Sequence, residues 1–295
     1  MAKAKEQKMK NNHITPKYVI KQWQVTNNQL PGVWVHDINK NKTYFSSAKK
    51  KAYSFAIEEY FYTPQINDIR INTIEKWLGN IEGTLDSFIN EVMKDIKSST
   101  ENEQPKLVDI EKYKEFLLAI FSLKNRNKYD INKQKEYLTK NPDVIKRLGV
   151  GQTTDLEIAV LENLINLTNI EATEYENCEI AICKNKPGNL ILCDRPFFFE
   201  SYEKSISFLT LSPEFFITIK KTNTKATYTY VEADEKIVDF LNRKAAEHAR
   251  HWIVAREIKT IDKYIPFILN EKQDDIPDFK TIDFPTVFYK LDKAQ

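Results

Sequence analysis

Glycine is scarce in this chain, at six of 295 residues. Neither Gly-x-Gly-x-x-Gly nor the P-loop pattern Gly-x-x-x-x-Gly-Lys-Ser/Thr occurs, although proteins that hold nucleotide phosphates on backbone amides commonly carry one of them. The sequence therefore predicts no nucleotide cofactor. A divalent metal remains compatible with the residues present, so the cofactor stays open.

Cysteine is also rare, and its spacing is uninformative. Cys178, Cys183 and Cys193 are an odd set without a Cys-x-x-Cys pair. An odd number argues against a complete disulfide framework and is typical of a reducing cytoplasm. Because no paired Cys or Cys/His spacing occurs, we assign no metal ligands.

Long apolar runs and a strong excess of one charge are missing too. No apolar stretch approaches the roughly 18 residues of a membrane-spanning helix, and the lysine-rich N-terminus lacks the apolar centre of a signal peptide. We expect a cytoplasmic protein without a membrane partner. The net charge of +2 excludes a broadly basic nucleic-acid binder but allows a local basic groove.

The composition that remains is typical of a globular protein. With 41% hydrophobic residues the chain can bury a sizeable core. Residues 1–10 are polar and without periodicity, which predicts a disordered basic leader. Three prolines after residue 262 indicate an irregular tail over residues 263–295, and we expect residues 11–262 to form a single domain.

Strand patterns lie at both ends of that domain and helical patterns in its middle. Val33–Asp37 and Thr43–Phe45 flank a polar turn and predict a hairpin. Apolar residues at intervals of three and four then predict four helices. They cover residues 72–97, about 110–121, 133–148, and a stretch that begins near Thr154. Gly79 and Gly83 weaken the first helix unless close packing requires them.

The last third returns to strands. Glu179–Lys184 and Leu190–Cys193 flank a Pro-Gly turn and predict one hairpin, while Phe215–Lys220 and Ala226–Val231 predict another. A helix over residues 234–256 is expected to close the core. The sequence therefore predicts an α+β fold, a single domain with N- and C-terminal β-hairpins around a central helical insertion.

His13 is the first candidate for catalysis. A histidine beside a turn bounded by Pro16 can act as general acid or base near neutral pH, and the proline restricts Thr15 to an extended conformation. The alternative is a turn histidine that caps a backbone carbonyl.

Asp194 is the second candidate, because it follows the apolar run 190–193 and so lies where a strand leaves its sheet. The alternative is an Asp-x-Pro turn whose carboxylate binds its own backbone.

These two segments, together with Thr210-Leu211-Ser212-Pro213 and Asn242, resemble domain-of-unknown-function family 4238. Members of this family open on His-His-x-x-Pro-x-x-Tyr, and Asn12 stands before His13 here. The resemblance implies a setting in bacterial mobile elements or anti-phage defence loci.

The resemblance also adds three residues to the candidate site. Arg126 matches the arginine of the family's Gln-x-x-Arg pattern, and Asn242 and Arg250 match polar positions on the closing helix. With Lys17 they are our candidates for phosphate or ligand binding, since a guanidinium binds phosphate in bidentate fashion. The alternative, which the residues themselves favour for Arg126 and Asn242, is a structural contact such as a buried carboxylate partner or a link between helix and sheet. His248 and His251, three residues apart on the same expected helix, are interpreted as histidines at the edge of the core.

The residues and the resemblance together suggest two functions. One is an anti-phage defence effector or toxin, a nuclease-like hydrolase that cleaves RNA or DNA phosphodiesters with His13 and Asp194. The other is a non-enzymatic sensor or adaptor that binds a phage or host component through a protein partner. The aromatic content of 12% is the feature that favours a binding surface.

Overall fold

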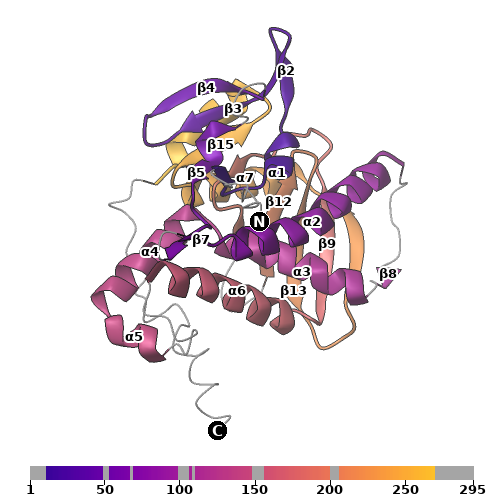
Figure 1. Ribbon diagram of the computed structural model, residues 1–295. Coiled ribbons are helices and arrows are strands. Elements are labelled where there is room, and N and C mark those ends of the chain that lie inside the picture. The colour runs from indigo at the N-terminus through magenta and orange to yellow at the C-terminus, as the bar shows by residue number, and fades with distance from the viewer. Residues whose placement is uncertain are drawn as a thin grey trace, which may run out of the picture.

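The computed structural model describes residues 11–48, 53–66, 69–98, 106–107, 110–147, 156–199 and 206–269 (Figure 1). These residues form one α+β domain with strands at both ends of the chain and helices between them, as the sequence predicts. The expected leader, residues 1–10, and residues 270–295 of the expected tail lie outside the described residues.

A five-stranded sheet joins the two ends of the chain. Its strand order is β10-β15-β3-β2, and β4 pairs with residues 32–37 of β3 to form the predicted N-terminal hairpin. Figure 1 shows the indigo strands β3 and β4 beside the yellow β15. The strands are β2 (Val25–Asn27), β3 (Leu30–Asp37), β4 (Lys42–Ser47), β10 (Leu192–Cys193) and β15 (Trp252–Ala255).

Strand β15 corrects one prediction. The helix expected over residues 234–256 ends at His248, and Trp252–Ala255 is instead a strand between β10 and β3. All four of its residues are buried, which explains a continuous apolar run that lacks alternation. Arg250 and His251 therefore lie in the turn before β15, not on a helix.

A six-stranded sheet forms the other β layer, in the order β11-β12-β13-β9-β14-β8. Alternate residues of β13 face opposite sides, so Ile217 and Ile219 enter the main core and Phe216 packs with Val238 and Leu241. The strands are β8 (Lys106–Leu107), β9 (Cys178–Lys184), β11 (Phe197–Phe199), β12 (Ile206–Ser212), β13 (Phe215–Lys221) and β14 (Thr227–Glu232).

The strand pairs predicted for the C-terminal part are wrong. Strand β10 pairs with β15 rather than with β9, and β14 pairs parallel with β9 rather than with β13. The hairpin that does form joins β12 and β13. Turn signals fix where the chain reverses, but they do not decide which strand it then joins.

Helices cover both faces of this sheet. Figure 1 shows α2 (Thr73–Ser98), α3 (Ile110–Asn125) and α6 (Leu156–Glu174) across one face. Helix α7 (Glu235–His248) contributes Val238 and Leu241 to the cluster on the other face. The expected third helix is divided at Asn141 into α4 (Lys128–Lys140) and α5 (Pro142–Arg147), because proline starts a helix more readily than it continues one.

Short elements complete the fold. Strand β1 (Asn11–His13) pairs with β5 (Ile57–Glu59), and β6 (Gln65–Ile66) pairs with β7 (Ile69–Arg70). The remaining short helices are α1 (Lys17–Lys21), η1 (Ser54–Ala56), α8 (Ile258–Tyr264) and η2 (Ile265–Phe267). The boundary expected at residue 262 falls inside α8. Within the described residues, no helix combines the length and apolar character needed to cross a bilayer.

Candidate active site

Backbone pairing fixes both His13 and the residue that follows it. It lies opposite Ile57 in the β1–β5 pair, and the next residue, Ile14, donates its N–H to the Ala56 carbonyl at 2.9 Å. Pro16 then precedes α1, where its fixed φ suits the start of a helix. The predicted turn motif is thus a strand end followed by one short helix, and His13 lies at that junction.

Arg126 is held beneath this junction and is almost completely buried, with 1% of its side chain exposed. Its Nε donates to the Ile14 carbonyl at 2.7 Å and its Nη1 to Glu82 Oε1 at 2.6 Å. Burial opposes its charge, but Glu82 and neighbouring phenols raise its pKa above the usual value. The guanidinium therefore ties the strand that carries His13 to helix α2.

Two carboxylates of α2 line the same region. Glu75 and Glu82 are seven residues apart, so they lie on one face of the helix two turns apart. Burial raises the pKa of Glu75, the nearby Arg126 lowers it, and the negative charge of Glu82 raises it again, so that it lies above its ordinary value. The Asn12 amide also lowers it, although no hydrogen bond of good geometry joins Asn12 Nδ2 to Glu75.

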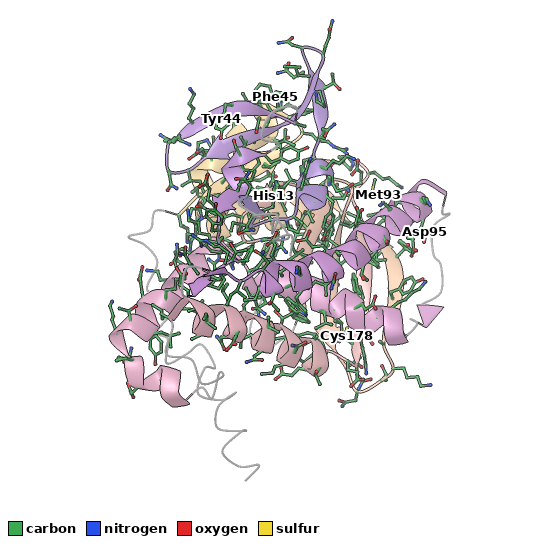
Figure 2. All side chains as sticks on the ribbon, in the orientation of Figure 1. His13, Tyr44, Phe45, Met93, Asp95 and Cys178 are labelled. Carbon is green, nitrogen blue, oxygen red and sulfur yellow. The ribbon has the colours of Figure 1, made fainter. Side chains whose placement is uncertain are left out.

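These residues line a pocket of about 390 Å³, which we call the His13 pocket. It is lined by His13, Lys17, Tyr18, Lys21, Glu75 and Glu82. Figure 2 places His13 near the middle of the molecule, whereas Met93 and Asp95 mark the far end of α2. The pocket lies where α1 meets the first half of α2. It presents two lysines four residues apart against the two carboxylates.

Tyr18 adds a hydroxyl to this pocket. Its oxygen is buried, and among the described residues nothing hydrogen-bonds to it. Burial and the negative charge of Glu82 raise its pKa, so the hydroxyl keeps its proton. Burying a hydroxyl without a hydrogen-bond partner destabilises the protein, and a polar ligand that bonded to this hydroxyl would offset that cost.

Asp194 makes its side-chain contacts elsewhere. Its Oδ1 accepts the Arg250 N–H at 2.9 Å, and its Oδ2 lies 2.8 Å from His251 Nδ1. The hypothesis that Asp194 orients a histidine therefore finds a different partner: the histidine is His251, in the turn between α7 and β15. The described hydrogen bonds and ion pairs of Asp194 do not include His13, Lys17 or Arg126.

Asn242 and Arg250 have structural contacts. Asn242 is buried, accepts the Ile191 N–H at 2.9 Å and donates to the Asn189 carbonyl at 3.1 Å, which ties the 189–191 segment to α7. Arg250 donates through Nη1 to the carbonyls of Glu247 and Ala249. Of the six predicted site residues, the structure thus groups His13, Lys17 and Arg126 together, pairs Asp194 with Arg250, and gives Asn242 a packing role.

Sequence reasoning missed Glu75, Glu82 and His251. The two glutamates carry a signal, a seven-residue spacing at the start of a strongly periodic helix, but only the path of α1 shows that this face meets His13. His251 was assigned to a helix, so its pairing with Asp194 could not be foreseen. Within the described part of the chain, no three His, Cys, Asp or Glu side chains are placed to hold a metal ion together.

The fold and this pocket define an α+β protein with a pocket of basic and acidic side chains supported by a buried arginine. The model of a family described as "Protein of unknown function (DUF4238)" matches residues 11–259, so the chain belongs to that family. Neither a curated protein nor a solved structure matches it.

Proposed function

We propose that this protein is a phosphodiester-cleaving hydrolase that works at the His13 pocket, with RNA as its preferred substrate and anti-phage defence as its setting. The observation that carries the proposal is the convergence of His13, two lysines and a glutamate of raised pKa in one pocket. Such sites pair an acid and a base whose environments differ.

The charges of the pocket favour an anionic ligand. Glu82 is paired with the buried Arg126, so the charges of these two groups cancel. When Glu75 is protonated, Lys17 and Lys21 leave the pocket with a net positive charge. Both lysines are exposed and can bind phosphate oxygens as point charges.

Cleavage of RNA needs only groups that the pocket contains. His13 would take the proton of the ribose 2′-hydroxyl, whose oxygen then bonds to phosphorus. The bond from phosphorus to the 5′-oxygen breaks, and protonated Glu75 would supply a proton to that leaving oxygen, which gives a 2′,3′-cyclic phosphate. Water would then open the ring with the two proton transfers reversed: Glu75 takes a proton from the water, and His13 returns its proton to the 2′-oxygen. Lys17 and Lys21 would stabilise the negative charge that gathers on the phosphoryl oxygens.

The test compares cleavage of end-labelled RNA and DNA of one sequence by the purified protein. We expect RNA cleavage, and a loss of about 100-fold or more in His13→Gln and in Glu75→Gln, the range typical of a lost acid or base. Glu91→Gln, at an exposed position of the same helix, is the matched control and should cleave as the wild type does. Equal rates in His13→Gln and the wild type, or no RNA cleavage by the wild type, would leave the adaptor hypothesis ahead.

A further inference from the structure

A second histidine has the geometry of an oriented proton acceptor. The Asp194 carboxylate is 5% exposed, whereas the His251 side chain is 25% exposed. One carboxylate oxygen is held by the Arg250 N–H and the other faces His251 Nδ1 at 2.8 Å. The carboxylate is thus fixed from inside the protein, and the imidazole extends from it toward solvent.

This contact also fixes the protonation of the ring. A carboxylate can only accept a hydrogen bond, so Nδ1 of His251 must carry the proton. In the neutral ring Nε2 then holds a lone pair, and none of the described residues donates a hydrogen bond to it. A buried carboxylate behind an imidazole is the arrangement that orients a catalytic histidine and stabilises its cation.

An arginine adjoins each member of this pair in the chain, since Arg195 follows Asp194 and Arg250 precedes His251. Arg195, next to Asp194, lies over the Tyr129 ring at 5.0 Å, and Arg250 lies over the same ring at 5.4 Å. Among the described residues, the Arg195 side chain donates only to Asp130, from Nη2 to the two carboxylate oxygens. Nε and Nη1 of this partly exposed guanidinium therefore remain able to bind an oxyanion.

We propose that Asp194, His251 and Arg195 form a second acid–base site, separate from the His13 pocket, that acts on phosphate esters. Arg195 binds the phosphoryl oxygens. His251 Nε2 takes a proton from water as the water oxygen bonds to phosphorus, and the bond from phosphorus to the ester oxygen breaks. The imidazolium then returns its proton to the departing alcohol. Asp194 is a positioning residue, because it acts only through the ring of His251.

The first test determines, without any substrate, which nitrogen of the His251 ring carries the proton. Long-range ¹H–¹⁵N spectra of the full chain should show His251 protonated at Nδ1. In Asp194→Asn, the new amide oxygen can still accept the Arg250 N–H, but its NH₂ then faces Nδ1. The ring must change to the Nε2-protonated tautomer while the fold is kept. A wild-type His251 protonated at Nε2 overturns the proposal.

The second test separates this site from the His13 pocket. In the His13→Gln background, hydrolysis of p-nitrophenyl phosphate and bis-p-nitrophenyl phosphate should persist. It should fall by about 100-fold when His251→Gln or Asp194→Asn is added. Inorganic phosphate should shift the His251 ring signals, and Arg195→Met should abolish that shift. The second site would be refuted if neither ester is hydrolysed, or if the hydrolysis rates and the phosphate-induced shifts are the same with and without these substitutions. Either result would leave the proposed RNA cleavage at His13 intact.

Discussion

Arg126 shows how one residue can support a site without lining its pocket. Its side chain reaches a carbonyl of the strand end that carries His13 and a carboxylate of α2, and its backbone carbonyl accepts the Tyr62 hydroxyl at 2.8 Å. A charge this deeply buried is tolerated only because each partner is present.

Replacing Arg126 by methionine should therefore destabilise the protein by about 3–5 kcal/mol, since Glu82 and the Ile14 carbonyl lose their donor. Lys128→Met is the control, because Lys128 and Glu58 form an ion pair about one third exposed and worth at most about 1 kcal/mol. Urea unfolding at pH 7 measures both. Equal losses in the two variants would show that Arg126 is no more important than a surface cation.

His248 gives the fold a dependence on pH. Burial, with the positive charges of Arg195, Arg250 and Lys244, lowers its pKa to about 4. Because the folded protein holds His248 neutral, the unfolded chain binds a proton there more readily. The contribution of His248 to the free energy of unfolding is therefore fully present above about pH 6.5. Between pH 6.5 and 4 its contribution should fall by about 1.4 kcal/mol per pH unit.

His248→Phe keeps the ring contact with Phe198 and removes the titration. Urea unfolding at pH 7 and pH 5 should show a smaller loss in the variant than in the wild type. The same loss in both proteins would exclude His248 as its source.

At the scale of elements, helix α2 carries two of the pocket residues and contains two glycines. A Cβ added at Gly79 or Gly83 would meet nothing within 4 Å, so close packing does not explain these residues. Gly79→Ala and Gly83→Ala should each stabilise the protein by about 0.5–1 kcal/mol, because alanine loses less backbone entropy in a helix.

Gly32 in β3 supplies the contrast. A Cβ there would lie 2.4 Å from the Ser46 carbonyl oxygen of the paired strand, so Gly32→Ala should destabilise the protein. Thermal unfolding of the three variants measures both the expected stabilisation in α2 and the expected destabilisation in β3. A gain in Gly32→Ala, or a loss in the two helical variants, would contradict the packing described for β3 and α2.

Periodicity predicted most helices and strands but not their partners. The apolar stripe of α2 placed that helix within one residue at each end, at Thr73 and Ser98. The apolar stripe of Ile237, Leu241 and Trp252 predicts a longer helix, whereas Trp252–Ala255 is a strand because it pairs with β10 and β3, which are distant in sequence. The candidate site shows the same division. His13 and Lys17 were proposed from a local motif and Arg126 from the family resemblance, whereas the positions of Glu75, Glu82 and His251 depend on long-range packing.

At the scale of the whole molecule, the two ends of the chain share structure. β15 lies between the N-terminal β3 and β10, and Arg256 donates to the Gln22 carbonyl at 3.1 Å. Trp23 is buried and donates to the Leu190 carbonyl at 2.7 Å. The N-terminal segment that carries His13 is thereby fixed to the C-terminal third.

We therefore expect cooperative unfolding. Tryptophan fluorescence and far-UV circular dichroism should give coincident urea transitions, as a single domain does. Two separate transitions would show that the five-stranded sheet and the helix-covered sheet unfold independently.

The central claim is that the His13 pocket performs acid–base chemistry with Glu75 as the acid, and the pH dependence of RNA cleavage tests it most directly. Because a general acid must be protonated, kcat/KM of the wild type should fall as the pH rises through the raised pKa of Glu75. Glu75→Gln should cleave slowly and lack this limb of the profile, while the control Glu91→Gln should retain it. An unchanged profile in Glu75→Gln would contradict the account.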